Sequence, residues 1–160
     1  MNRLLPQTAS ARLRRAAAVA VLTALAFAGP AQAQFATVPA PELGTPPPAS
    51  AAEHEKQYRV EAARHLYSAY PARIYKGRLP PLLYSVMVVE TEIDAMGQVA
   101  NVHVVRKPAA DEVAPWVVAM IKRAAPYPAP SRLGFARFTE IWLVDKSGRF
   151  QVDALTEGQR

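Results

Sequence analysis

The apolar positions between residues 84 and 155 alternate with polar ones, then recur with a helical spacing, and then alternate again. A period of two predicts a strand with one covered face, whereas spacings of three and four predict an amphipathic helix. The predicted elements are strands at 84–93 and 99–106, a helix at 111–124, and strands at 135–144 and 149–155. This order favours an α+β fold, in which a helix packs against a small antiparallel sheet of three to four strands.

The same spacing predicts which residues form the core. In the first strand, the inward face consists of Met87, Val89, Thr91 and Ile93. The helix presents an apolar stripe of Val113, Trp116, Val117, Met120, Ile121 and Ala124. In the third strand, Phe138, Glu140, Trp142 and Val144 share one face. Trp142 therefore has two interpretations: it covers the core, or it points outward near a sheet edge and anchors a peptide.

Two turns share one local sequence. Residues 94–97 and 145–148 each begin with Asp and end with Gly, in the pattern D-x-x-G. An Asp side chain can accept a hydrogen bond from the backbone two residues further on, and Gly adopts positive φ without steric cost. Both segments are therefore predicted to be hairpin turns.

A further helix is predicted before the sheet, at residues 50–69. Ser50 and Glu53 match the S-x-x-E capping box, which marks a helix start. Pro71 ends the helix, because the residue before a proline avoids the α region. The pairs expected on its solvent side are Glu55 with Arg59 and Glu61 with His65.

Residues 1–33 resemble a secretory signal peptide. Four arginines and no acidic residue precede or border an apolar run of 13 residues at 16–28, and residues 31–33 read Ala-Gln-Ala, a small-x-small cleavage site. A bilayer-spanning helix needs about 20 apolar residues. We therefore expect cleavage after Ala33 and a periplasmic product. An uncleaved segment would instead place the protein at the inner membrane, on the periplasmic side.

The predicted folded domain spans residues 70–155. Residues 34–49 contain five prolines and are predicted to be a linker with nothing to bury, reaching about 50 Å at roughly 3 Å per residue. Residues 156–160 are expected to fray.

Charge gives little support to a nucleic-acid partner. The chain has 19 basic and 13 acidic residues, a net charge of +6. Removing residues 1–33 takes away four basic residues and leaves 15 against 13, a net charge of +2. The basic character therefore belongs largely to the export segment. Cysteine is absent, so disulfides cannot stabilise the fold.

The sequence contains no recognisable catalytic or metal motif. Two of the three histidines, His54 and His65, would lie roughly 16 Å apart along the predicted helix, too far to share a metal. Glu90 and Glu92 could be read as a carboxylate pair, but a solvated strand face explains them better. We predict no enzyme activity, no metal and no cofactor; a hydrolase with an unfamiliar site is the least favoured reading.

A small basic cluster lies between the predicted helix and the sheet. Arg73, Lys76 and Arg78 fall within six residues. They could bind an acidic partner or lipid head groups, or they could simply keep a loop soluble.

The order of these parts resembles the C-terminal domain of the TonB and TolA energy transducers. Residues 70–73 read Tyr-Pro-Ala-Arg and resemble the Y-P-x-x motif that opens that domain. Residues 89–104, with Asp94 and Gly97 in the turn, resemble its V-x-x-D-G-x-V hairpin. Residues 111–128 resemble its helix and proline-rich exit, and residues 135–143 resemble its following strand.

The resemblance implies a periplasmic module that binds a protein or peptide by strand addition, as TonB does with segments of outer-membrane transporters. It implies that the third strand is the pairing edge. The partner-binding residues predicted in this way are Tyr70, Pro71, Arg73, Thr139, Glu140, Ile141, Trp142 and Leu143. A homodimer through the same edge is the other form of pairing.

Two features depart from a transducer. The apolar run at 16–28 carries a cleavage site, and a reach of about 50 Å is short for crossing the periplasm. We therefore expect a soluble or locally tethered relative. The alternative is a structural or interaction protein of the envelope, in which the fourth strand closes the sheet edge and no motor coupling exists.

Overall fold

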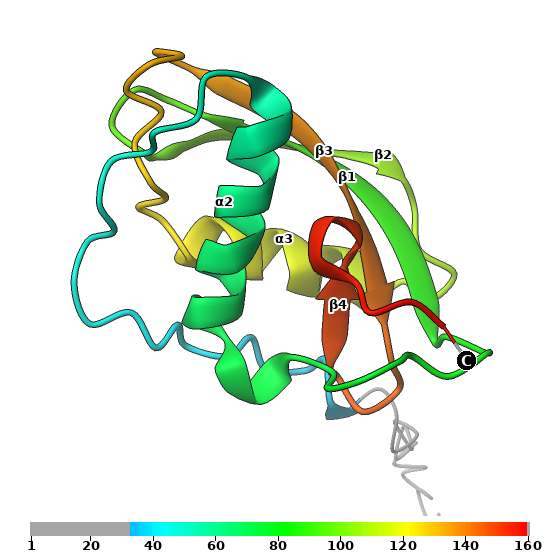
Figure 1. The fold of residues 1–160 in the computed structure, drawn as a ribbon. Coiled ribbons are helices and arrows are strands. Elements are labelled where there is room, and N and C mark those ends of the chain that lie inside the picture. Colours follow the sequence, from blue (N-terminus) through cyan, green and yellow to red (C-terminus); the bar gives the residue numbers. More distant parts are fainter. Residues whose placement is uncertain (1–32, 160) are drawn as a thin grey trace, which may run out of the picture.

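Within residues 33–159, which the computed structural model describes, four antiparallel strands form one sheet, and helices α2 and α3 lie on one side of it (Figure 1). The predicted export segment, apart from Ala33, lies outside the described residues. The elements are α2 Glu55–Ala69, η1 Pro71–Arg73, β1 Ser85–Ile93, β2 Val99–Arg106, α3 Val113–Arg123, β3 Ala136–Val144, β4 Phe150–Val152 and η2 Asp153–Leu155, where η marks a 3-10 turn. The fold is α+β, with the strand order β2-β1-β3-β4.

The strand faces alternate as the sequence period predicts. Every second residue of β1 and of β3 is buried. The register pairs Met87 with Trp142 and Val89 with Glu140, so the covered faces of the two strands coincide. Helix α3 contributes the predicted stripe, with Val113, Trp116, Val117, Met120 and Ile121 buried. The predicted core of β1, α3 and β3 is confirmed, and Trp142 belongs to it.

Both hairpin turns are confirmed. The Asp94 carboxylate accepts a hydrogen bond from the backbone N–H of Met96 at 2.8 Å, and Gly97 closes the turn with φ of 79°. In the second turn, the Asp145 carboxylate accepts from the N–H of Ser147 at 2.9 Å. Local side-chain chemistry is sufficient to form these turns.

The start of α2 differs from the prediction. The helix begins at Glu55, and the N-cap is His54, whose Nδ1 accepts from the N–H of Gln57 at 3.3 Å. Ser50 lies outside the helix, where its N–H donates to the carbonyl of Ala129 at 2.9 Å. The predicted capping box is therefore wrong, because a contact distant in sequence occupies the Ser50 backbone.

The face that α2 buries also differs from the prediction. The buried residues of α2 are Tyr58, Ala62, Ala63, His65, Leu66 and Ala69. His65 was expected on the solvent side but is buried, with Nε2 2.7 Å from the Ala124 carbonyl oxygen. The His65 ring also lies 4.8 Å from the ring of Tyr127, so its partners come from the segment that follows α3 and not from α2 itself.

The predicted linker packs on the domain. Phe35 is only 6% exposed, and its ring stacks on Tyr84 at 5.5 Å and meets Trp116 edge-on at 5.1 Å. The indole N–H of Trp116 donates to the carbonyl of Thr37 at 3.3 Å. The expectation that residues 34–49 have nothing to bury is therefore wrong for Phe35, because one aromatic ring fills a place in the core.

The tail is ordered as far as Gln159. The N–H of Leu79 donates to the Gly158 carbonyl at 2.9 Å, and the Thr156 hydroxyl donates to the Gln151 side chain at 2.9 Å. Residues 156–159, which the sequence predicts to fray, thus lie against the domain, in contact with Leu79 and Gln151.

Candidate binding edges of the sheet

The outer edge of β2 is open. Strand β2 pairs with β1, and within residues 33–159 no other segment pairs with it or forms a hydrogen bond with its backbone. Five of its eight residues are exposed. An unpaired row of backbone N–H and C=O groups is a template for an additional strand.

Two irregularities bracket this edge. The register of β2 against β1 shifts between Val88 and Val89 and again between Glu92 and Ile93. Residues 101–104 of β2 lie between the shifts and pair regularly. Bulges limit how far a strand can extend along an edge, so the regular pairing surface of β2 is short.

A hollow of about 340 Å³ lies beside the start of β2. Its walls are residues 98–102 together with Lys122, in the last turn of α3, and Ala125, just after that helix. Half-buried Val99 and Val102 give it an apolar side, and exposed Lys122 gives it one positive charge. A segment lying along β2 could therefore place an acidic group next to this ammonium.

The opposite edge of the sheet is closed over residues 142–144 of β3. Strand β4 pairs with residues 142–144 of β3. The outer side of β4 is in turn occupied, because the N–H of Tyr75 donates to the Phe150 carbonyl at 2.9 Å. The Gln151 side-chain amide donates to the carbonyls of Tyr75 and Gly77, at 2.8 Å each. The segment around Tyr75 therefore shields the edge that β4 would otherwise expose.

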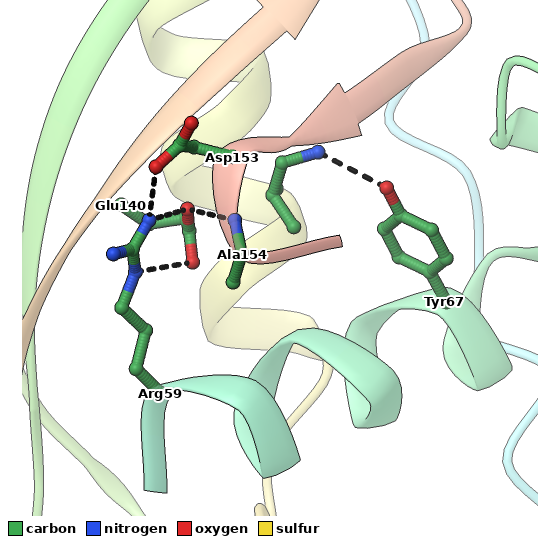
Figure 2. Close-up of polar contacts among 6 residues, drawn as sticks. Arg59, Tyr67, Glu140, Asp153 and Ala154 are labelled. Carbon is green, nitrogen blue, oxygen red and sulfur yellow. Dashed lines mark hydrogen bonds and ion pairs between the residues drawn. The ribbon is translucent and has the colours of Figure 1, made fainter. Parts of the chain in front are cut away.

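A charged cluster fastens this closure, as Figure 2 shows. Arg59 of α2 donates to both oxygens of the Glu140 carboxylate, at 3.0 and 2.8 Å, and to Asp153 at 2.7 Å. The N–H of Ala154 donates to Glu140 at 3.0 Å. The hydrogen bond to Glu140 raises the pKa of Arg59 above its ordinary value, so the guanidinium stays charged. The cluster joins α2, β3 and η2.

The predicted partner-binding residues fall into separate environments. Trp142 is buried, with its ring 4.6 Å from that of Phe150, and Glu140 is buried in the cluster. Thr139 is exposed, and Ile141 and Leu143 are half-buried on the outer sheet face. Residues 136–141 of β3 have no strand beyond them, since β4 reaches only residue 142.

The other predicted site residues lie at the end of α2. The Tyr70 hydroxyl donates to the Met120 carbonyl at 2.9 Å, and burial raises the pKa of Tyr70 to about 12. Pro71 is exposed at the start of η1, and half-exposed Arg73 lies near Gly148. The structure therefore does not bring the eight predicted residues together into one surface. Tyr70 and Trp142 serve the core.

The sequence did not predict that β2 would be an open edge of the sheet. The second hairpin strand has five apolar residues among its eight, and the other three, Asn101, His103 and Arg106, are polar. That polarity is typical of an edge strand. It does not say which strand is the edge, because that depends on where β3 and β4 pair.

The described part of the chain contains neither a metal-binding cluster of side chains nor a helix that could span a membrane. Among residues 33–159, no three His, Asp or Glu side chains gather in a metal-binding arrangement. Glu92 forms an ion pair with Arg137 at 2.7 Å. No helix in this part of the chain has the length and apolar character that crossing a membrane requires.

No family model, curated protein or solved structure matches this chain. The TonB and TolA resemblance therefore rests on the residues quoted above and on the order of the elements.

Proposed function

We propose that this chain is a periplasmic binding module, similar to the TonB C-terminal domain, that receives an extended peptide segment as an additional strand along β2. The observation that supports the proposal is the unpaired backbone edge of β2. Strand addition draws affinity from main-chain hydrogen bonds and needs no reactive side chain. This mode of binding suits a chain whose sequence has no catalytic motif.

The resemblance implies pairing along residues 139–143 of β3, whose last two residues already pair with β4, so β2 is the better candidate. Residues 142–144 of β3 already pair with β4. A guest at those residues would have to displace β4 and break the contacts of Arg59 with Glu140 and Asp153. A guest at β2 displaces nothing in residues 33–159, so its binding carries no such cost.

The geometry of β2 favours a short guest with an acidic group. The regular stretch between the bulges has room for about four paired residues, or roughly 13 Å. Val99 and Val102 favour an apolar side chain nearby, and Lys122 favours a carboxylate. Following the resemblance, the proposed guests are periplasmic segments of outer-membrane transporters.

The proposed activity does not include force transmission from an inner-membrane motor. Because Phe35 is buried in the domain, the predicted linker of 16 residues cannot act as a free tether. About seven residues then separate the apolar run at 16–28 from the domain, which corresponds to about 25 Å at most. Even an uncleaved segment would keep the module close to the inner membrane.

The second candidate is a structural protein of the envelope that does not bind peptides. The closure of the β3 edge by β4 and the charged cluster favours it. In that case the exposed side of α2 supplies the contact surface. The two candidates differ in whether β2 accepts a strand.

An amide-shift titration separates them. The isotope-labelled protein is mixed with synthetic peptides that correspond to periplasmic segments of outer-membrane transporters, with and without an acidic residue. We expect shifts in residues 99–106 and a weaker response in Lys122→Glu, by about tenfold or more for acidic peptides. Lys56→Glu, on the exposed side of α2, is the matched control and should bind like the parent protein.

The alternative outcomes are distinct. Shifts confined to residues 138–144 and 149–155 would return the binding site to β3. No shifts with any peptide would exclude strand pairing with this guest class and favour the structural candidate.

A further inference from the structure

Several chain segments meet at one end of the sheet, where β1 begins and β3 ends. The register pairs Ser85 with Val144, so the turn at 145–148 lies beside the loop that enters β1. The hydrogen bond from Tyr75 to Phe150 brings residues 71–79 to the same place. Five cations, here called the basic end, lie on these segments: Arg73, Lys76, Arg78, Lys146 and Arg149.

The cations of the basic end outnumber the carboxylates beside them and form no ion pairs with them. Within residues 33–159, none of the five forms an ion pair. The nearby carboxylate of Asp145 already accepts from Ser147, through the N–H at 2.9 Å and the hydroxyl at 2.6 Å. The Glu157 carboxylate accepts from the N–H of Gly77 at 3.1 Å. These donors are neutral and leave both carboxylates charged, so the five cations outnumber the two anions and the basic end keeps a net positive charge.

The basic end is also hollowed. A depression of about 420 Å³ is lined by residues 71–72 and 74–76 together with Arg149. Lys76 and Arg149 are exposed at its rim, and Tyr75 forms part of its wall. Two cations around one concavity suit an anionic head group such as a phosphate.

Apolar side chains accompany the charge. Leu82, in the loop that enters β1, is 88% exposed, the highest value of any large apolar side chain in the described residues. The outer sheet face also becomes apolar toward this end, where half-buried Val86 and Val88 pair with Leu143 and Ile141. Leu82 lies four residues after Arg78 in the sequence, and an exposed leucine combined with cations is typical of surfaces that enter a lipid interface.

The chain itself leads to this end. Gln34 lies against Gly148, since a Cβ built there would come within 3.2 Å of the Gln34 Cβ. Phe35 is anchored between Tyr84 and Trp116. The described part of the chain therefore begins at the basic end.

We propose that the basic end is a docking surface for anionic lipids at a membrane surface. Lys76 and Arg149 bind lipid phosphates, and Leu82 enters the boundary between head groups and acyl chains. Docking applies whether or not the export segment is removed, and it goes beyond the peptide-binding function because it uses different residues. The regular stretch of β2 at 101–104 lies away from these residues and remains open.

The absence of cysteine makes a direct test practical. Leu82→Cys in the full chain is labelled with a polarity-sensitive dye and mixed with vesicles of phosphatidylglycerol or of phosphatidylcholine. Met96→Cys is the matched control, because Met96 is 76% exposed in the turn at the opposite end of β1. We expect a blue shift of the dye at position 82 with phosphatidylglycerol only, and none at position 96.

Charge variants complete the test. Lys76→Gln/Arg149→Gln should weaken the response at position 82 by about tenfold or more, since each cation near an anionic surface contributes about a fivefold gain. Lys56→Gln/Arg64→Gln, which removes two exposed cations of α2, should leave it unchanged. Inorganic phosphate alone should produce no shift.

Three outcomes would overturn the proposal. An equal response at positions 82 and 96 would show that the basic end has no special role. An equal response to both lipids, or an unchanged response in Lys76→Gln/Arg149→Gln, would show that lipid charge is not recognised. No response at position 82 with either lipid would exclude docking.

Discussion

The hydroxyl of Tyr67, in α2, accepts a hydrogen bond from the backbone N–H of Val152, the last residue of β4, at 3.1 Å (Figure 2). Together with Arg59, this contact means that a strand of only three residues is held from the side by a helix. A strand so short gains little stability from its own backbone hydrogen bonds to the neighbouring strand. Side chains of α2 therefore help to hold β4 beside residues 142–144 of β3, whereas β2 has no strand beyond it.

Replacing Arg59 should destabilise the fold strongly. Arg59→Met leaves the buried Glu140 carboxylate without its cation, and we expect a loss of about 3–5 kcal/mol in unfolding free energy. Arg132→Met is the matched control, because Arg132 and Glu53 are both exposed and such pairs contribute about 0–1 kcal/mol. Urea unfolding measures both. Equal losses in the two variants would mean that the cluster does not fasten β4.

Stability should fall as the pH drops below neutral because of His65. Burial lowers the pKa of His65 below its ordinary value of 6.5, although the hydrogen bond with the Ala124 carbonyl opposes this shift. The unfolded chain then binds a proton more readily than the folded one. The unfolding free energy therefore has its full value, as far as His65 is concerned, above about pH 6.5. It decreases as the pH falls toward the pKa of folded His65, by at most about 1.4 kcal/mol per pH unit.

Unfolding measured between pH 5 and 7 checks this dependence. His65→Gln should flatten the slope, whereas His103→Gln, on exposed β2, should preserve it. The interpretation fails if His65→Gln retains the full slope.

The two hairpin glycines should respond differently to substitution. Gly97 and Gly148 both have positive φ, of 79° and 71°. A Cβ on Gly97 would come within 2.2 Å of the backbone oxygen of Tyr127, whereas one on Gly148 would first meet the end of the Arg73 side chain at 3.0 Å. Positive φ costs a non-glycine residue roughly 1–2 kcal/mol in either turn. We expect Gly97→Ala to lose at least about 2 kcal/mol more than Gly148→Ala in thermal unfolding; similar losses would contradict the close approach.

Removing the Phe35 ring should release the segment before α2. Phe35→Ala removes a buried aromatic side chain, and we expect a loss of about 3 kcal/mol and a change in Trp116 fluorescence. Phe135→Ala, at a position 41% exposed, should cost about 0.5 kcal/mol or less. If Phe35→Ala is as mild as the control, residues 34–49 act as a free linker after all.

Local patterns in the sequence predicted much of the sheet. The D-x-x-G turns formed where expected because Asp and Gly act within a few residues. The covered faces of β1, α3 and β3 were correct because periodicity records which side of an element meets the core. The prediction of β2 matched its bounds, 99–106.

Contacts between distant residues account for the errors. Ser50 meets Ala129 instead of capping α2, Phe35 reaches Trp116, and residues 156–159 meet the segment at 77–79. Each of these partners is remote in sequence, and no local spacing records it. The candidate binding edge also depends on contacts between distant residues, because whether a strand lies at an edge is set by how the other strands pair.

The amino-acid order thus determined the strands, the turns, the helix stripe of α3 and the absence of cysteine chemistry, since each depends on residues a few positions apart. Only the folded chain decided that β4 and the Arg59 cluster cover residues 142–144 of β3, that β2 stays open, and that five cations without ion pairs lie on segments that meet at one end of the sheet. Those outcomes depend on which distant segments pack together, because the apolar faces of all helices and strands must be buried in the same core.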